Sequence, residues 1–128
     1  MEPTILIIDD SEDDILLTKM VLTKIRGKIK VDAARDGEEG LALLRSGTEL
    51  TDVILLDLKM PRMGGLDVLH VIRSDERLRS TPMIIVTHSD LESDKEASYK
   101  SGANGYLNKS VDLDQFTKHI RNELAKWI

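Results

Sequence analysis

Polar side chains that could bind a cation or a phosphoryl group follow four short, largely apolar runs of the chain. The runs and the residues after them are 5–8 with Asp9 and Asp10, 53–56 with Asp57, 83–86 with Thr87, and 105–108 with Lys109. Carboxylate oxygens are preferred ligands of Mg²⁺. A hydroxyl and a lysine ammonium can hydrogen-bond phosphoryl oxygens. This set of side chains therefore suits a divalent cation together with a phosphoryl group.

Strand and helix signals alternate along the chain, which predicts βα units around a parallel sheet. Five strands are expected, at residues 4–8, 29–33, 52–56, 81–86 and 105–108. The second of these alternates apolar and polar residues, which is typical of a strand at the edge of a sheet. Ligands of open α/β sheets bind outside the carboxyl ends of the strands. The polar residues that follow the strands are therefore expected to meet at one edge.

Side chains able to cap a helix precede four of the five expected helices. They are Ser11, Asp36, Ser89 and Asp112, each with an acidic or amide residue three positions later. Gly27 and Gly47 end the first and second helices. The acidic cluster at 12–14 is interpreted as a helix N-terminus favoured by the helix dipole, not as additional metal ligands.

The composition narrows the class of protein. A chain of 128 residues has the usual size of one domain. It has no cysteine, no apolar run of membrane-spanning length and no basic segment before an apolar stretch at its start. A net charge of −5, without a basic stripe, speaks against nucleic-acid binding. We therefore expect a cytoplasmic protein that binds neither a membrane nor nucleic acid.

Taken together, four sequence elements resemble the receiver domain of two-component response regulators, over essentially the whole chain. They are Asp9-Asp10, the segment DLKMPRMGG at 57–65, Thr87 after Met-Ile-Ile-Val, and the segment GANGYLNK at 102–109. The resemblance implies a flavodoxin-like (βα)5 fold, with a doubly wound five-stranded parallel sheet in the order 2-1-3-4-5. We expect one receiver domain over residues 1–128 and no output domain.

The resemblance also implies the roles of the acidic residues and of the lysine. Asp57 would accept a phosphoryl group from a histidine kinase or a histidine phosphotransfer protein. Asp10 and Asp57 would bind Mg²⁺ directly, Asp9 would bind it through water, and the backbone carbonyl of Lys59 would supply a third protein oxygen. Lys109 would hold its ammonium against Asp57 and then against a phosphoryl oxygen. These roles agree with the chemistry, because a carboxylate attacks an anionic donor only where their charge repulsion is cancelled.

In the same family, a hydroxyl and an aromatic side chain report phosphorylation. These residues are Thr87, which would move to the phosphoryl group, and Tyr106, which would rotate inward into the space left behind. A downstream protein would bind the fourth helix, at 91–101, together with the fifth strand and fifth helix. The resemblance leaves a homodimer open.

Two positions depart from the family pattern. Ser110 follows Lys109 where the family usually has proline, so the peptide between them is expected to be trans with a shifted loop, or else a strained cis exception. His88 follows Thr87 where the family usually has a small residue. Its imidazole would stand at the mouth of the pocket, either as a gate that restricts donor and water or as an ordinary surface histidine.

Two further rim residues bear on the lifetime of the phosphoryl group. Lys59 and Ser89 occupy the positions that border this group in the family, and neither offers a carboxylate or an amide to orient water. A long-lived phosphoryl state is therefore expected.

Two other classes of function compete with this reading. One is an interaction module that keeps the fold without using phosphorylation, which the intact set of acidic, hydroxyl and amine groups argues against. The other is a phosphoaspartyl hydrolase, which commonly needs an acid/base carboxylate two residues after the nucleophile. That position is Lys59, so no enzyme activity is expected beyond self-phosphorylation and slow loss of the phosphoryl group.

Overall fold

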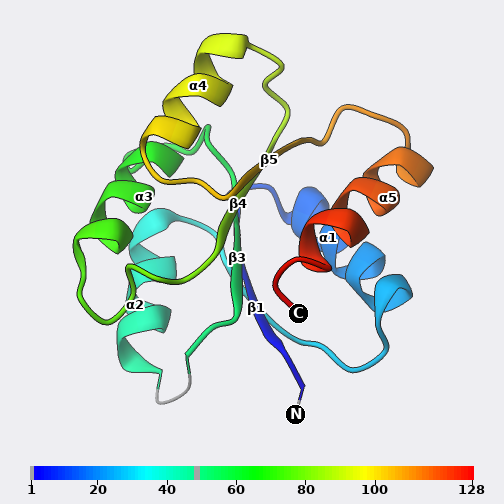
Figure 1. The fold of residues 1–128 in the computed structure, drawn as a ribbon, viewed down its shortest axis with the longest axis horizontal. Coiled ribbons are helices and arrows are strands. Elements are labelled where there is room, and N and C mark those ends of the chain that lie inside the picture. The colour runs from blue at the N-terminus through cyan, green and yellow to red at the C-terminus, as the bar shows by residue number, and fades with distance from the viewer. Residues whose placement is uncertain (1, 48–49) are drawn as a thin grey trace.

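A five-stranded parallel sheet lies between two layers of helices in the computed structural model, which describes residues 2–47 and 50–128 (Figure 1). The strands are β1 (Thr4–Ile8), β2 (Lys30–Ala34), β3 (Val53–Leu56), β4 (Met83–Thr87) and β5 (Gly105–Asn108). The helices are α1 (Glu12–Ile25), α2 (Gly37–Ser46), α3 (Gly65–Ser74), α4 (Glu92–Lys100) and α5 (Leu113–Leu124). The strand order β2-β1-β3-β4-β5 confirms the predicted topology.

Alternating side chains of the central strands fill two separate cores. On β1, Ile5 and Ile7 point into the core beneath α1 and α5, whereas Leu6 and Ile8 point into the core beneath α2 and α3. In Figure 1, α1 and α5 cover one face of the sheet, and α2, α3 and α4 cover the other. Because both faces are covered, the central strands β1, β3 and β4 are apolar at every position except Thr4 at the start of β1 and Thr87 at the end of β4.

Hydrogen bonds between neighbouring strands continue past the strand ends into the polar residues. The backbone N–H of Asp57 donates to the carbonyl of Ile8 at 2.9 Å, and that of Lys109 donates to the carbonyl of Thr87 at 2.7 Å. The backbone N–H of Asp9 likewise donates to the carbonyl of Ala34 at 3.0 Å. The sheet therefore fixes the backbone from which the polar side chains project.

The structure corrects the predicted cap of α4. Ser89 is not its N-cap, because the helix begins after Leu91, which supplies no side-chain cap. The Ser89 hydroxyl instead donates to Asp94 Oδ2 at 2.5 Å. The predicted caps Ser11, Asp36 and Asp112 are confirmed, since each accepts a hydrogen bond from a backbone N–H in the first turn of its helix.

Two further sequence predictions concern the peptide bond after Lys109 and the length of the helices. The described residues contain no cis peptide, so the bond between Lys109 and Ser110 is trans, one of the two alternatives considered. No helix among those residues is long and apolar enough to cross a membrane.

Candidate functional site

Three carboxylates meet at the carboxyl edge of the sheet. Asp9 and Asp10 follow β1 and Asp57 follows β3, and one oxygen of each lies within 4.8 Å of the others. Asp9 and Asp57 are buried, whereas Asp10 is exposed to solvent. The edge therefore carries a compact group of hard oxygen ligands that is open on one side, which fits a cation that keeps part of its water shell.

Asp57 has one carboxylate oxygen without a partner in the described part of the chain. Its Oδ1 is buried and receives no hydrogen bond. Burial raises the pKa of Asp57, Lys109 opposes this rise, and the neighbouring charge of Asp9 adds to it. A buried, unpaired carboxylate oxygen is costly. A cation at this edge would relieve that cost, so the residues present fit a divalent metal ion.

Replacing Asp57 should make the protein more stable at neutral pH when divalent cations are removed. A carboxyl whose pKa is raised above its ordinary value of 3.8 binds its proton more tightly in the folded state. The stability of the wild type therefore falls as the pH rises through the folded-state pKa. Asp57→Asn carries no such charge and should gain about 1 kcal/mol in free energy of unfolding at pH 7.

Urea unfolding in EDTA across the acid range measures this difference. The advantage of Asp57→Asn should shrink below pH 4 and also when Mg²⁺ is added, because a cation that binds only the folded wild type stabilises it. Equal urea midpoints for the two proteins in EDTA at neutral pH would contradict the expectation.

Lys109 is held by two carboxylates and lies near a third. Its Nζ donates to Asp9 Oδ2 at 2.7 Å and to Asp14 Oδ2 at 2.9 Å, and it stands 3.7 Å from Asp57 Oδ2. Only 1% of its side chain is exposed. Burial alone would lower the pKa of Lys109, but the hydrogen bonds to Asp9 and Asp14 outweigh it, and the pKa is raised. The amine is therefore a fixed positive charge inside an acidic site.

Asp14 is a site residue that was not identified from the sequence. It was assigned to the helix terminus with Glu12 and Asp13, but it lies on the face of α1 that turns toward Lys109. The hydrogen bonds from Lys109 and His88 outweigh the effect of burial and lower the pKa of Asp14. The acidic first turn of α1 explains Asp14 as well as it explains its neighbours, so the sequence carried no separate signal for its role.

A cavity of about 410 Å³ opens beside this group of charges. Its lining residues are Asp10, Ser11, Asp13, Asp14, Asp57, Lys59, Thr87 and His88. Thr87 is fully buried at the base of the sheet edge, and its hydroxyl accepts a hydrogen bond from the backbone N–H of Ser89 at 3.3 Å. Five of the residues predicted from the sequence, Asp10, Asp57, Lys59, Thr87 and His88, therefore line one opening.

Three of the predicted residues, Tyr106, Ser89 and Lys59, make polar contacts on the α4 side. The Tyr106 hydroxyl donates to the carbonyl of Ser89 at 3.0 Å, and the Tyr106 side chain is half-buried. Lys59 extends its ammonium to Asp94 Oδ2, 3.2 Å away, which also accepts from the Ser89 hydroxyl. Asp94, in the first turn of α4, was not identified from the sequence, and it connects this helix to the loops after β3 and β4.

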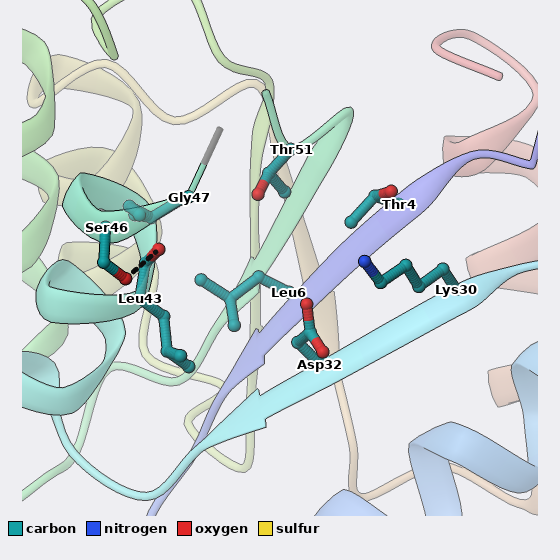
Figure 2. Close-up of a pocket in the computed structure, with 9 residues that line it drawn as sticks. Thr4, Leu6, Lys30, Asp32, Leu43, Ser46, Gly47 and Thr51 are labelled. Atoms are coloured by element: carbon teal, nitrogen blue, oxygen red, sulfur yellow. Dashed lines mark hydrogen bonds between the residues drawn. The ribbon is translucent and has the colours of Figure 1, made fainter. Parts of the chain in front are cut away.

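A second cavity, of about 390 Å³, lies near the amino ends of β1 and β2. Figure 2 shows Thr4, Lys30, Asp32 and Thr51 around it, with Leu6 between them. None of the residues predicted from the sequence to form a site lines this cavity. The predicted site residues therefore lie away from this cavity.

The comparisons with known proteins agree with the fold. The model of the response regulator receiver domain matches residues 5–121. PilH of Pseudomonas aeruginosa is 36% identical over 121 residues, which cover 94% of this chain and 97% of PilH.

Two solved response regulators have closely similar structures. The phosphorylated cyanobacterial phytochrome response regulator RcpA superimposes with a TM-score of 0.89 at 31% identity, covering 99% of this chain and 94% of RcpA. The Mn²⁺-bound form of response regulator Rcp1 has a TM-score of 0.82 at 32% identity, covering 94% of this chain and 90% of Rcp1. The chain belongs to the receiver domain family of two-component response regulators, a class of signalling modules.

Proposed function

We propose that this receiver accepts a phosphoryl group on Asp57 in the cytoplasm, from a histidine kinase or a histidine phosphotransfer protein, and thereby changes the surface it offers to a protein partner. The observation that carries the proposal is the unpaired, buried Oδ1 of Asp57 beside two further carboxylates and one buried amine. The Asp57 carboxylate therefore lies beside a candidate cation site and beside the fixed positive charge of Lys109.

Mg²⁺ is the cofactor that suits this set of ligands. Asp10 and Asp57 would bind it directly, and the backbone carbonyl of Lys59 would complete the protein ligands. Asp9 suits contact through water, because its Oδ1 accepts from the backbone N–H of Ser11 and its Oδ2 accepts from Lys109. The bound cation would neutralise charge on the carboxylates and on the phosphoryl oxygens. The Mn²⁺-bound structure of Rcp1 supports a divalent ion in a related protein.

The chain's own residues suit an in-line transfer. A carboxylate oxygen of Asp57 attacks phosphorus, the bond from phosphorus to the donor atom breaks, and its electron pair leaves with the donor. The product is an acyl phosphate. Lys109 Nζ, which lies 3.7 Å from Asp57 Oδ2, is close enough to pair with an oxygen of the transferred group. Attack by an anion on an anion is slow unless such charges are positioned in advance.

Phosphorylation would then change the β4 and β5 side of the molecule. Thr87 lines the same cavity as Asp57, and the Tyr106 hydroxyl donates a hydrogen bond to the carbonyl of Ser89, which is two residues after Thr87 in the sequence. A shift of Thr87 toward the phosphoryl group would alter this loop and the position of Tyr106. The surface of α4, β5 and α5 would carry the change to a downstream protein.

Incubation with acetyl phosphate and Mg²⁺, followed by intact mass spectrometry, tests the proposal. The wild type should gain the mass of one phosphoryl group, whereas Asp57→Asn should gain none. Stoichiometric phosphorylation of Asp57→Asn at another acidic residue would refute the assignment. A wild type that stays unlabelled by acetyl phosphate and by phosphorylated histidine phosphotransfer proteins would instead favour an interaction module independent of phosphorylation.

A further inference from the structure

A closed chain of hydrogen bonds connects the buried lysine to the residue that follows it in sequence. Asp14 Oδ2 accepts from Lys109 Nζ at 2.9 Å and lies 3.0 Å from His88 Nε2. His88 Nδ1 lies 2.8 Å from the hydroxyl oxygen of Ser110. The β4–α4 loop, the β5–α5 loop and α1 are thereby joined at one carboxylate oxygen.

The chemistry of the acceptor fixes the directions of these bonds. The ionised Asp14 carboxylate can only accept, so His88 must carry a hydrogen on Nε2. In the neutral ring Nδ1 then accepts from the Ser110 hydroxyl. Proline, which the family usually has at position 110, could not donate this bond. The two departures from the family pattern, His88 and Ser110, are therefore partners of each other.

We propose that Asp14 is a positioning residue for Lys109, and that His88, held by Ser110, keeps Asp14 in place. The proposal rests on the proposed function, because Lys109 is the group that would meet the phosphoryl oxygens. Asp14 acts through Lys109 and does not touch the reacting atoms. On this proposal, His88 and Ser110 help to hold Asp14, and Asp14 holds the Lys109 ammonium that would meet the phosphoryl oxygens.

The distances around Lys109 indicate how Asp14 sets the position of the ammonium. Lys109 has hydrogen bonds to Asp9 and Asp14 but stands 3.7 Å from Asp57. A lysine ammonium is a compact charge on a flexible side chain, so the position of the ammonium is determined by its hydrogen-bond acceptors. Without Asp14 the ammonium would have one anchor and would shift toward Asp57, pairing with the nucleophile before the donor arrives. Asp14 thus keeps the Lys109 ammonium near the Asp57 carboxylate but prevents the two groups from forming a close ion pair.

Asp13 provides a matched control for the loss of charge. It is exposed, lines the same cavity and follows the same cap residue, but it makes no ion pair among the described residues. Asp13→Asn and Asp14→Asn therefore remove the same charge from the same opening. Any difference between them reports the contact with Lys109.

The ammonium resonance of Lys109 in ¹H–¹⁵N NMR is the first readout. Lys109 is the only buried lysine among residues 2–47 and 50–128, so its ammonium protons should exchange slowly enough to observe. Asp14→Asn should shift or broaden this signal, whereas Asp13→Asn should leave it in place. His88→Ala should also move it, although His88 contacts Asp14 and not the lysine.

The rate of labelling by acetyl phosphate at saturating Mg²⁺ is the second readout. Asp14→Asn should be about tenfold slower than Asp13→Asn, because small displacements of a catalytic charge cost this much or more. His88→Ala should be slower than wild type, and His88→Gln, which can still donate to Asp14, should recover the rate. Urea midpoints measured alongside separate these effects from loss of folding.

Several outcomes would overturn the positioning role. They include an unmoved Lys109 resonance in Asp14→Asn and equal labelling rates for the Asp13 and Asp14 variants. Faster labelling of His88→Ala would do the same and would favour a gate, one of the two roles that the sequence left open for His88. The NMR result needs no phosphorylation, so a failure of the proposed function, seen as an unlabelled wild type, is distinguishable from a failure of this inference.

Discussion

Gly65→Ala is expected to lower the free energy of unfolding by about 3 kcal/mol, near the upper end of what overpacking usually costs. A Cβ atom at this position would lie 2.3 Å from the backbone oxygen of Asp57 and 2.8 Å from the Cα of Leu58. Both atoms belong to the backbone, so no side chain can rotate away to make room. The helix α3 would have to move off the loop that follows β3.

The same displacement should reach the site. The backbone N–H of Gly65 donates to the carbonyl of Leu58 at 2.9 Å, which fixes the loop immediately after Asp57. Moving this loop would shift the Asp57 carboxylate relative to Asp10 and Lys109. We therefore also expect slower labelling by acetyl phosphate in Gly65→Ala, even under conditions where the variant is fully folded.

Gly64→Ala is the matched control for this substitution. Gly64 has φ of −74°, which alanine adopts freely, and a Cβ there would approach nothing closer than the carbonyl of Leu58 at 3.4 Å. Urea unfolding should therefore show a much smaller loss for Gly64→Ala than for Gly65→Ala. Equal losses for the two variants would mean that the close approach of α3 to the Asp57 backbone is not what requires glycine.

The fold was predictable because its main signals are local. The central strands β1, β3 and β4 are built on the apolar runs 5–8, 53–56 and 83–86, and Asp9 and Asp57 come directly after two of these runs. Once parallel strands are aligned, their carboxyl ends must share an edge. The strand order that the family resemblance implied then placed Asp9, Asp57 and Lys109 near one another, without knowledge of any side-chain contact.

The contacts made by helix residues were not predictable in the same way. Asp14 belongs to an acidic first turn that the helix dipole already explains, and its bond to Lys109 spans 95 residues of sequence. Asp94 likewise looks like an ordinary first-turn acid, yet it pairs with Lys59 across the site. Such contacts depend on how the helices dock on the sheet, which apolar patterns determine only roughly.

The role of Arg73 was not predicted from the sequence, although its guanidinium group donates several hydrogen bonds in the structure. It donates to the carbonyls of Arg79, Thr81 and Gly102 and to the side-chain oxygen of Asn104, at 2.8 to 3.0 Å. All of these acceptors are neutral, and burial lowers the pKa of Arg73. The planar fork of donors, not a partner charge, is what holds the residue in place.

These bonds tie α3 to the segments that precede β4 and β5. Gly102 and Asn104 lie in the loop that leads from α4 into β5, and the Asn104 side chain also accepts from the backbone N–H of Met83 at 2.8 Å. The position of α4 relative to the sheet therefore depends on Arg73. The proposed output surface includes this helix.

Arg73→Ala is expected to lower the free energy of unfolding by about 3 kcal/mol, because it removes several hydrogen bonds and leaves partly buried carbonyls without a donor. Arg73→Lys keeps the charge but loses the fork, so we expect an intermediate loss of about 2 kcal/mol. Urea unfolding at neutral pH measures both. Arg79→Ala, at an exposed arginine whose side chain makes no ion pair among the described residues, controls for the loss of a charge. If Arg73→Lys were as stable as wild type, charge alone would explain the role of Arg73, and the geometry of the fork would not matter.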